Sequence, residues 1–247
     1  MSGHSKWSTI KRKKGANDAK RGKIFTKLIR EITIAAREGG GDPDGNPRLR
    51  LAIQNAKGQN LPKDNIERAI NKASGAEADD YQELTYEGYA AHGVAVFLEC
   101  ATDNQNRTVQ SVRSLFSKYG GSLGVNGSVD YLFERKGVFL IKSSEGVDQE
   151  NVVLELIDGG AEEVNFNEGY LEVTSAREDF GNLQSKLDEL GLELESAELQ
   201  RIPTTTVSLN DEDFTDVMKL IDAFEDDDDV QKVYHNVKAT EKQLSLL

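Results

Sequence analysis

Residues 137–201 switch repeatedly between two hydrophobic patterns, and the order of these patterns constrains the fold more than any other feature of the sequence. Apolar residues at every second position predict strands, and apolar residues at every third or fourth position predict helices. In chain order we expect strand 137–143, helix 149–158, strand 162–167, strand 169–175, helix 178–190 and strand 193–201. This β-α-β-β-α-β order predicts a ferredoxin-like α+β sandwich.

The chain on both sides of this sandwich predicts further strands and helices. In chain order these are strands 84–90 and 93–101, helix 105–119, strand 129–135, strand 204–209, helix 211–225 and strand 230–236. The last three elements alone cannot bury the face of a sheet. We therefore expect them to complete the sheet that begins at residue 84, with the sandwich inserted between the two parts.

The first 75 residues predict helices only. Segment 18–38 carries apolar side chains at the spacing of an amphipathic helix, namely Phe25, Leu28, Ile29, Ile32 and Ala36. Two shorter helices follow, one with Asn46 as its N-cap and one that opens near Pro62. The expected fold is an α+β multidomain protein with a three-helix N-terminal domain and two ferredoxin-like α/β sandwich domains, one inserted in the other. The expected domains are residues 1–78, residues 79–135 with 203–247, and residues 136–202.

The charge of the chain is distributed unevenly. The 247 residues carry a formal net charge of -13, yet residues 1–75 contain 17 Lys and Arg against 7 Asp and Glu, a net of +10. The remaining residues contain 13 against 36, a net of -23. Such an asymmetry is typical of a nucleic-acid-binding end attached to a body that phosphate repels.

The positive charge is concentrated in residues 4–23, HSKWSTIKRKKGANDAKRGK, which we name the basic segment. Lys20, Lys23, Lys27 and Arg30 continue it along one face of the first expected helix, nearly opposite the apolar stripe. Basic side chains of the segment can bind phosphates, its Ser and Thr hydroxyls can contact the nucleic-acid backbone, and the ring of Trp7 can stack on a base. A solvated arm is the alternative for the charges, and packing against the helix is favoured for Trp7. The expected nucleic-acid-binding residues are His4, Ser5, Lys6, Trp7, Lys11, Arg12, Lys13, Lys14, Lys20, Arg21, Lys23, Lys27 and Arg30.

Motifs of catalysis, of metal binding and of cofactor binding are not found in the sequence. The three histidines belong to no metal motif, and the glycine-rich stretch at 39–46 lacks the Gly-Lys-Ser/Thr of a P-loop. The acidic run Glu225–Asp229 lacks the alternating spacing of a calcium loop, so we interpret it as a solvated loop that repels nucleic acid. We expect no enzymatic activity, no cofactor and no small-molecule substrate. A hydrolase with dispersed carboxylates, such as Asp103, Asp130 and Asp158, is a weaker alternative.

The N-terminal end and the apolar runs bear on localisation. The first residues are polar and basic with no apolar region behind them, and no apolar run approaches the roughly 18 residues that a membrane-spanning helix needs. We expect a cytoplasmic protein that does not enter the membrane.

Several motifs resemble one family across essentially the whole chain. GHSKWSTIKRKKGANDAKRGKIFTKLIREI, NPRLRLAIQNAK, LPKDNIERAI, TYEGY, GSVDYLF and DDDDVQKVYHN are similar to the corresponding parts of the YebC/PmpR family. The resemblance implies a helical domain followed by two α+β domains. Members are described as DNA-binding transcriptional regulators, while the mitochondrial branch and bacterial work point to translation on ribosomes that stall at proline-rich stretches. The family's nucleic-acid-facing motif falls here on His4, Ser5, Lys6, Trp7, Ile10, Lys11, Lys13, Lys14, Asp18, Arg21, Lys23 and Lys27.

These observations lead to one expected function and two alternatives. We expect a non-enzymatic, DNA-binding transcriptional regulator whose basic N-terminal domain binds phosphates. The first alternative is a ribosome-associated translation factor that binds ribosomal RNA or tRNA, because phosphate contacts look the same in DNA and RNA. The second is an acidic scaffold that binds a basic protein partner.

Overall fold

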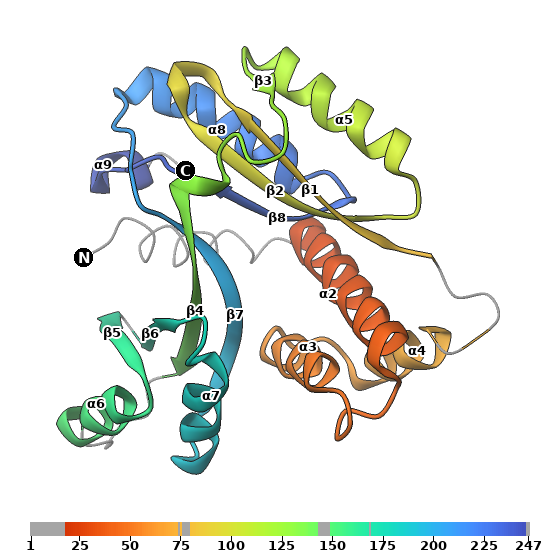
Figure 1. Cartoon of the computed structure of the whole chain (residues 1–247), viewed down its shortest axis with the longest axis vertical. Helices are drawn as coiled ribbons and strands as arrows, with labels where there is room; N and C mark the ends of the chain where they lie inside the picture. The colour runs from red at the N-terminus through yellow and green to blue at the C-terminus, as the bar shows by residue number, and fades with distance from the viewer. Residues whose placement is uncertain (1–17, 74, 76–79, 143–148, 168, 246–247) are drawn as a thin grey trace. The chain divides into compact units, whose positions relative to one another are not determined.

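The computed structural model describes residues 18–73, 75, 80–142, 149–167 and 169–245 (Figure 1). Two compact units divide the described chain. The first unit contains the described parts of Met1–Arg30, Glu77–Glu134 and Ile202–Leu247, and the second contains those of Glu31–Ala76 and Arg135–Arg201. The predicted division into three domains is a finer one and stays a prediction.

A four-stranded sheet in the order β3-β1-β2-β8 forms the centre of the first unit. Its strands are β1 (Gln82–Tyr89), β2 (Ala95–Thr102), β3 (Ser122–Leu123) and β8 (Val230–His235). Strand β1 pairs antiparallel with β2 and with β3, and β2 pairs antiparallel with β8. Helices α5 (Gln105–Lys118) and α8 (Asp211–Glu225) belong to the same unit.

Strand β2 is mostly apolar, with Glu99 and Thr102 as its polar residues, and both of its faces are covered. Val96, Leu98 and Cys100 lie in the core that α5 and α8 contribute to, where the rings of Phe116 and Phe224 meet edge to face with centroids 4.8 Å apart. Ala95 and Phe97 point to the other face, where they pack with Val129, Phe133 and Tyr234. Alternate residues of a strand point to opposite faces, so a central strand covered on both sides reads as a continuous apolar run.

The second unit contains a sheet in the order β5-β6-β4-β7. Its elements run in the predicted β-α-β-β-α-β order: β4 (Phe133–Lys142), α6 (Gln149–Asp158), β5 (Ala161–Asn167), β6 (Tyr170–Ala176), α7 (Phe180–Glu189) and β7 (Leu194–Pro203). Phe139 and Ile141 of β4 pack with Leu156 of α6 and with Leu183 and Leu187 of α7. The expected α+β fold class, with N-terminal helices and two four-stranded antiparallel sheets, is confirmed.

Helices α2 (Asp18–Gly39), α3 (Pro47–Gly58) and α4 (Lys63–Ala73) form the N-terminal part. Asn46 is the N-cap of α3, as predicted: its side-chain oxygen accepts from the backbone N–H of Leu49 at 3.1 Å, and its amide nitrogen donates to the carbonyl of Ala35 at 2.7 Å. Helix α2 changes unit at the bond between Arg30 and Glu31. From Ile32 to Ala36 its residues are buried on every side.

Helix α3 completes the outer edge of strand β7 in the second unit. Asn55 Nδ2 donates to the carbonyl of Ala197, and the backbone N–H of Ala197 donates to Asn55 Oδ1, each at 2.9 Å. The side-chain amide therefore pairs with β7 as a neighbouring strand would. Close approach at the end of α3 supports this pairing, since a Cβ on Gly58 would lie 1.9 Å from the carbonyl oxygen of Glu195.

The Gly58→Ala substitution is expected to lower the free energy of unfolding of the second unit by about 2–3 kcal/mol, because backbone atoms of β7 must move to admit the methyl group. Urea unfolding measures the change. Gly22→Ala in helix α2 is the matched control, because nothing lies within 4 Å of its added Cβ and a helical Gly→Ala change stabilises by up to about 1 kcal/mol. Equal effects of the two substitutions would contradict the close packing of α3 on β7.

Two predictions about strands are wrong: one pair of expected strands is a single strand, and one expected strand does not form. The strands expected at 129–135 and 137–143 are one strand, β4, preceded by the short 3-10 turn η2 (Asp130–Leu132). Gly137 does not end a strand; a Cβ there would lie 2.4 Å from Ser175 Oγ and 2.8 Å from the ring of Phe180, so the position needs glycine for close packing. Residues 204–209 form no strand and make only an isolated parallel bridge from Val207 to Val237. The short elements β3 and α9 (Glu241–Leu244) were not predicted.

Candidate nucleic-acid interface

Most of the expected nucleic-acid-binding residues lie outside the part of the chain that the structure describes. These residues are His4, Ser5, Lys6, Trp7, Lys11, Arg12, Lys13 and Lys14. The backbone of Lys20 is helical, but its side chain is not among those described. Arg21, Lys23, Lys27 and Arg30 are described, and all four belong to helix α2 in the first unit.

Lys23 and Lys27 contact the acidic run Glu225–Asp229, which joins α8 to β8. Lys23 Nζ donates to Asp226 Oδ1 at 2.8 Å and to the backbone carbonyl of Asp226 at 3.1 Å. Lys27 Nζ donates to the backbone carbonyl of Glu225 at 2.8 Å. Arg21, two residues before Lys23, is exposed, with its guanidinium carbon 5.7 Å from the centroid of the Phe25 ring. The predicted basic face of the helix therefore contacts protein from Lys23 onward.

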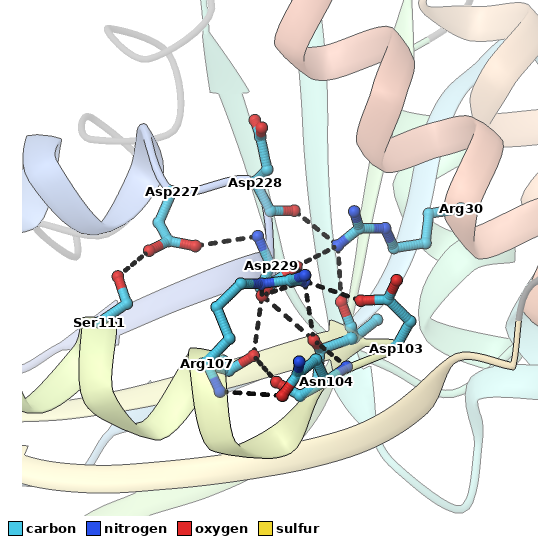
Figure 2. Close-up of polar contacts among 11 residues, drawn as sticks. Arg30, Asp103, Asn104, Arg107, Ser111, Asp227, Asp228 and Asp229 are labelled. Atoms are coloured by element: carbon cyan, nitrogen blue, oxygen red, sulfur yellow. Dashed lines mark hydrogen bonds and ion pairs between the residues drawn. The ribbon is translucent and has the colours of Figure 1, made fainter.

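Arg30 is the most deeply placed cation of this face. Its Nη1 donates to the carbonyls of Ala101 and Asp228, each at 2.6 Å, and lies 3.4 Å from Asp229 Oδ1 (Figure 2). Its guanidinium also lies 4.8 Å from the centroid of the Tyr81 ring, within range of a cation–π contact. The side chains of Arg30 and Asp229 are only 10% and 8% exposed. Arg30 is thus a buried anchor of helix α2 in this structure.

Asp229 collects hydrogen bonds from three segments of the first unit. Its Oδ2 accepts from the hydroxyl of Thr108 at 2.8 Å, from the hydroxyl of Thr102 at 3.1 Å and from Nη2 of Arg107 at 2.9 Å. Thr102 ends strand β2, whereas Arg107 and Thr108 lie in the first turn of α5, where helix N–H groups favour a negative charge. Figure 2 shows Arg107 and Arg30 reaching Asp229 from different elements.

The backbone of the acidic run is held as well. Asp227 Oδ1 accepts from the backbone N–H of Asp229 at 2.9 Å, and Asp227 Oδ2 accepts from the hydroxyl of Ser111. The carbonyl of Asp229 accepts from the N–H of Ala101 at 2.9 Å. The prediction of a solvated loop is therefore wrong for Asp227 and Asp229, whose carboxylates organise the loop, and it fits Asp226 and Asp228, which are exposed.

The electrostatics of Asp229 follow from these contacts. Burial opposes ionisation of the carboxyl, but the hydrogen bonds from Thr108, Arg107 and Thr102 outweigh burial, so the pKa of Asp229 lies below its usual value. The carboxylate is charged at neutral pH and faces the guanidinium groups of Arg30 and Arg107. Two arginines on one buried carboxylate make a structural ion-pair network.

The carboxylates of the hydrolase alternative are divided between the two units. Asp103 pairs with Arg107 at 2.8 Å, and Asp158 belongs to the other unit. Over the described ranges, no group of three or more His, Cys, Asp or Glu side chains is arranged to hold a metal ion. None of the described helices has both the length and the hydropathy needed to cross a membrane.

Family models match both halves of the sequence. The model of the TACO1/YebC protein N-terminal domain matches residues 5–76, and the model of the TACO1/YebC second and third domain matches residues 81–237. The chain belongs to the TACO1/YebC family. The resemblance of the sequence motifs to the YebC/PmpR family is thereby confirmed.

Relatives within the TACO1/YebC family align over nearly their full length. A protein of Amoebophilus asiaticus named "Probable transcriptional regulatory protein" is 59% identical over 96% of this chain and 98% of its own. A relative from Idiomarina loihiensis with the same kind of name is 53% identical over 100% of this chain and 99% of its own. The crystal structure of a conserved hypothetical protein from Aquifex aeolicus superposes with a TM-score of 0.81 at 44% identity, covering 91% of this chain and 93% of that one.

The contacts between helix α2 and the acidic run were not predicted from the sequence. A signal for them exists: Lys23, Lys27 and Arg30 share one helical face, and the acidic run far along the chain carries the opposite charge. Taken separately, the basic face predicts phosphate binding and the acidic run predicts a solvated loop. Thr102 and Thr108, which complete the Asp229 network, carry no local signal, because two isolated threonines are common in any sequence.

Proposed function

We propose that the chain is a non-enzymatic, nucleic-acid-binding regulator of gene expression that acts as a DNA-binding transcriptional regulator in the cytoplasm. The names of the relatives as transcriptional regulatory proteins support the class of function. No catalytic or cofactor chemistry is required for this role.

The distribution of charge carries the proposal. Residues 1–30 contain ten Lys and Arg against one Asp, a net of +9, whereas the rest of the chain has a net of -22. Of the net charge of +10 in residues 1–75, +9 thus precedes Glu31. A net of +9 over 30 residues attracts a polyanion, while the acidic remainder limits contact with it.

The contacts of helix α2 divide the predicted residues into two roles under this proposal. Lys27 and Arg30, bound to Glu225 and Asp229, hold the helix on the first unit. Phosphate binding then falls to the basic segment, with Arg21 the exposed described cation at its end. Lys23 stands between the two roles, because its side chain is 41% exposed and its partner Asp226 is 64% exposed. Weak, exposed pairs of this kind exchange readily with phosphate.

Binding to duplex DNA is expected to weaken steeply with salt. If about six phosphates are neutralised, the logarithm of the association constant falls with the logarithm of salt concentration at a slope of about -5. Fluorescence anisotropy with a labelled duplex between low and physiological salt measures the slope. A slope near zero would contradict phosphate-dominated binding.

Fractionation of cells into chromosomal DNA and ribosomes separates DNA from ribosomal RNA as the target. Under the DNA proposal, the chain co-purifies with chromosomal DNA and is absent from ribosomal fractions of the same cells. Co-sedimentation with ribosomes at physiological salt, together with loss from the DNA fraction, would overturn the DNA proposal in favour of the translation alternative. Function that survives deletion of residues 1–22 would favour the acidic scaffold.

A further inference from the structure

A buried carboxylate shapes one loop of the first unit. Glu87 of strand β1 is 3% exposed, and it accepts hydrogen bonds from three backbone N–H groups, two in the loop between β3 and η2 and one at the first residue of η2. Its Oε1 lies 2.6 Å from the nitrogen of Gly127, and its Oε2 lies 2.7 Å and 2.9 Å from those of Val129 and Asp130. We name residues Gly124–Asp130 the Glu87 loop. The two motifs TYEGY and GSVDYLF of the sequence meet here, the first supplying the carboxylate and the second the N–H groups.

Further backbone contacts remove freedom from the Glu87 loop. The N–H of Gly124 donates to the carbonyl of Glu87 at 2.7 Å, and the hydroxyl of Tyr89 donates to the carbonyl of Ser128 at 3.1 Å. A Cβ on Gly124 would lie 2.5 Å from Ser128 Oγ, and Gly127 has a φ of +84°, which favours glycine. Charge-assisted bonds to a buried carboxylate are strong, so the loop holds one conformation.

This fixed loop directs one apolar side chain inward, while two apolar side chains at it are exposed. Val129 is fully buried against Phe97 and Phe133. Val125 is 78% exposed, and Tyr131, which follows the loop directly, is 70% exposed. Among the described residues these are the two most exposed large hydrophobic side chains.

The side chains of Tyr131 and Tyr89 are hydrogen-bonded, but the exposed carbon surface of Tyr131 and Val125 adds nothing to the apolar core of the first unit. An apolar side chain left in water contributes nothing to the hydrophobic stabilisation of the fold. Burying the Glu87 carboxylate carries a desolvation cost that only its hydrogen bonds offset. A rigid loop that presents a tyrosine and an aliphatic side chain is a preorganised binding element, because binding then costs little conformational entropy, and tyrosine is enriched among the residues that dominate interface energies.

The charge near the loop indicates the chemistry of its partner. Residues 119–134 contain no Lys or Arg; Asp130 directly precedes Tyr131, and Glu134 follows it by three residues, before the basic pair Arg135 and Lys136. A polyanion would be repelled by this surface, so stacking of Tyr131 on a nucleic-acid base is disfavoured. A protein with an apolar pocket and a basic rim matches both the exposed side chains and the flanking carboxylates.

We propose that the Glu87 loop is a protein-docking element, in which Tyr131 and Val125 enter an apolar pocket of a partner protein whose rim carries Lys and Arg. This surface is separate in sequence and charge from the basic segment, and it does not depend on the proposed DNA binding.

Site-specific photo-crosslinking tests the docking element. The full chain carries p-benzoylphenylalanine at position 131 and is irradiated in its native host cells, and a second version carries it at position 113, an exposed residue of α5 in the same unit. We expect a nuclease-resistant adduct with a protein from position 131 and none from position 113. The adduct protein, identified by mass spectrometry and purified, is then titrated with the unlabelled full chain.

Affinity for that purified protein decides the proposal. Tyr131→Ala is expected to raise its Kd at least tenfold and Val125→Ser severalfold, while Arg113→Ala leaves it within twofold. Both of the first two side chains are exposed, so folding is expected to survive, and circular dichroism checks this. Glu87→Gln, which weakens the support of the loop, is expected to act in the same direction as Tyr131→Ala.

Four outcomes would overturn the proposal. They are the absence of an adduct at position 131, an adduct that nuclease removes, an adduct of twice the mass of the chain, and a Kd that Tyr131→Ala leaves unchanged. The nuclease-sensitive adduct would assign the loop to nucleic acid, and the double-mass adduct would assign it to a second copy of the chain.

Discussion

Asp229→Ala is expected to lower the free energy of unfolding of the first unit by about 3–5 kcal/mol. The substitution removes the carboxylate that accepts from Thr102, Arg107 and Thr108, and it leaves the guanidinium of Arg30 buried without its counter-charge. A buried charge that loses its partner retains its desolvation cost without the compensating attraction. Urea unfolding followed by circular dichroism measures the loss.

Asp226→Ala is the matched control for Asp229→Ala. It removes a carboxylate from the same acidic run, but the pair of Asp226 with Lys23 is largely exposed, so its loss is expected to cost less than about 1 kcal/mol. Equal costs for the two substitutions would show that burial of the Arg30–Asp229 pair contributes nothing. An increase in stability on Asp229→Ala would contradict the network as a whole.

The contribution of Asp229 is expected to depend on pH in one direction. The folded-state pKa of its carboxyl lies below the value of about 3.9 for an unfolded Asp, so its stabilisation is complete above the unfolded pKa and is lost as the pH falls through the folded pKa. The difference in unfolding free energy between the natural chain and Asp229→Asn should therefore be largest near neutral pH and shrink below about pH 4. A difference that grows on acidification would contradict an ionised Asp229.

Element order was predictable because local hydrophobic period determines it. The ferredoxin-like order of 137–201 and helices such as α5 and α8 follow from side-chain spacing along a single segment. The errors occur where glycine or a short extended run has two meanings. Gly137 was interpreted as a break between strands, but it permits close contact with Ser175 and Phe180, and that contact depends on a residue 38 positions away.

The contacts that surround the candidate interface were beyond prediction for a related reason. The amide of Asn55 pairs with Ala197, and the carboxylate of Glu87 holds N–H groups some 40 residues later. Neither residue type at its position indicates a partner so distant in sequence. Charge alone suggested that the N-terminal end binds phosphate, but charge does not distinguish a cation that meets phosphate from one, such as Arg30, that meets a carboxylate of its own chain.

Replacing Lys11, Arg12, Lys13 and Lys14 together by alanine is expected to reduce affinity for duplex DNA on the order of 10³-fold at about 0.1 M salt. Four of about six phosphate contacts would be lost, and each contact contributes about -0.9 to the salt slope. The slope should therefore become shallower, from about -5 to about -2. Anisotropy titrations of the natural and substituted chains over the same salt range measure both quantities. Stability should be unchanged, because the Arg30–Asp229 anchor of helix α2 is intact.

A second fourfold substitution separates local binding from total charge. Lys57, Lys63, Arg68 and Arg113 are exposed, and replacing them by alanine changes the net charge by the same amount outside the basic segment. This control is expected to lower DNA affinity less than about tenfold, since long-range charge effects are screened within about 10 Å at 0.1 M salt. If both fourfold variants lose affinity equally, the chain senses DNA through its overall charge and the basic segment is no binding site. If neither loses affinity, phosphate binding must reside in cations such as Arg21 and Lys23, and Lys23 would then have to exchange its contact with Asp226 for one with DNA.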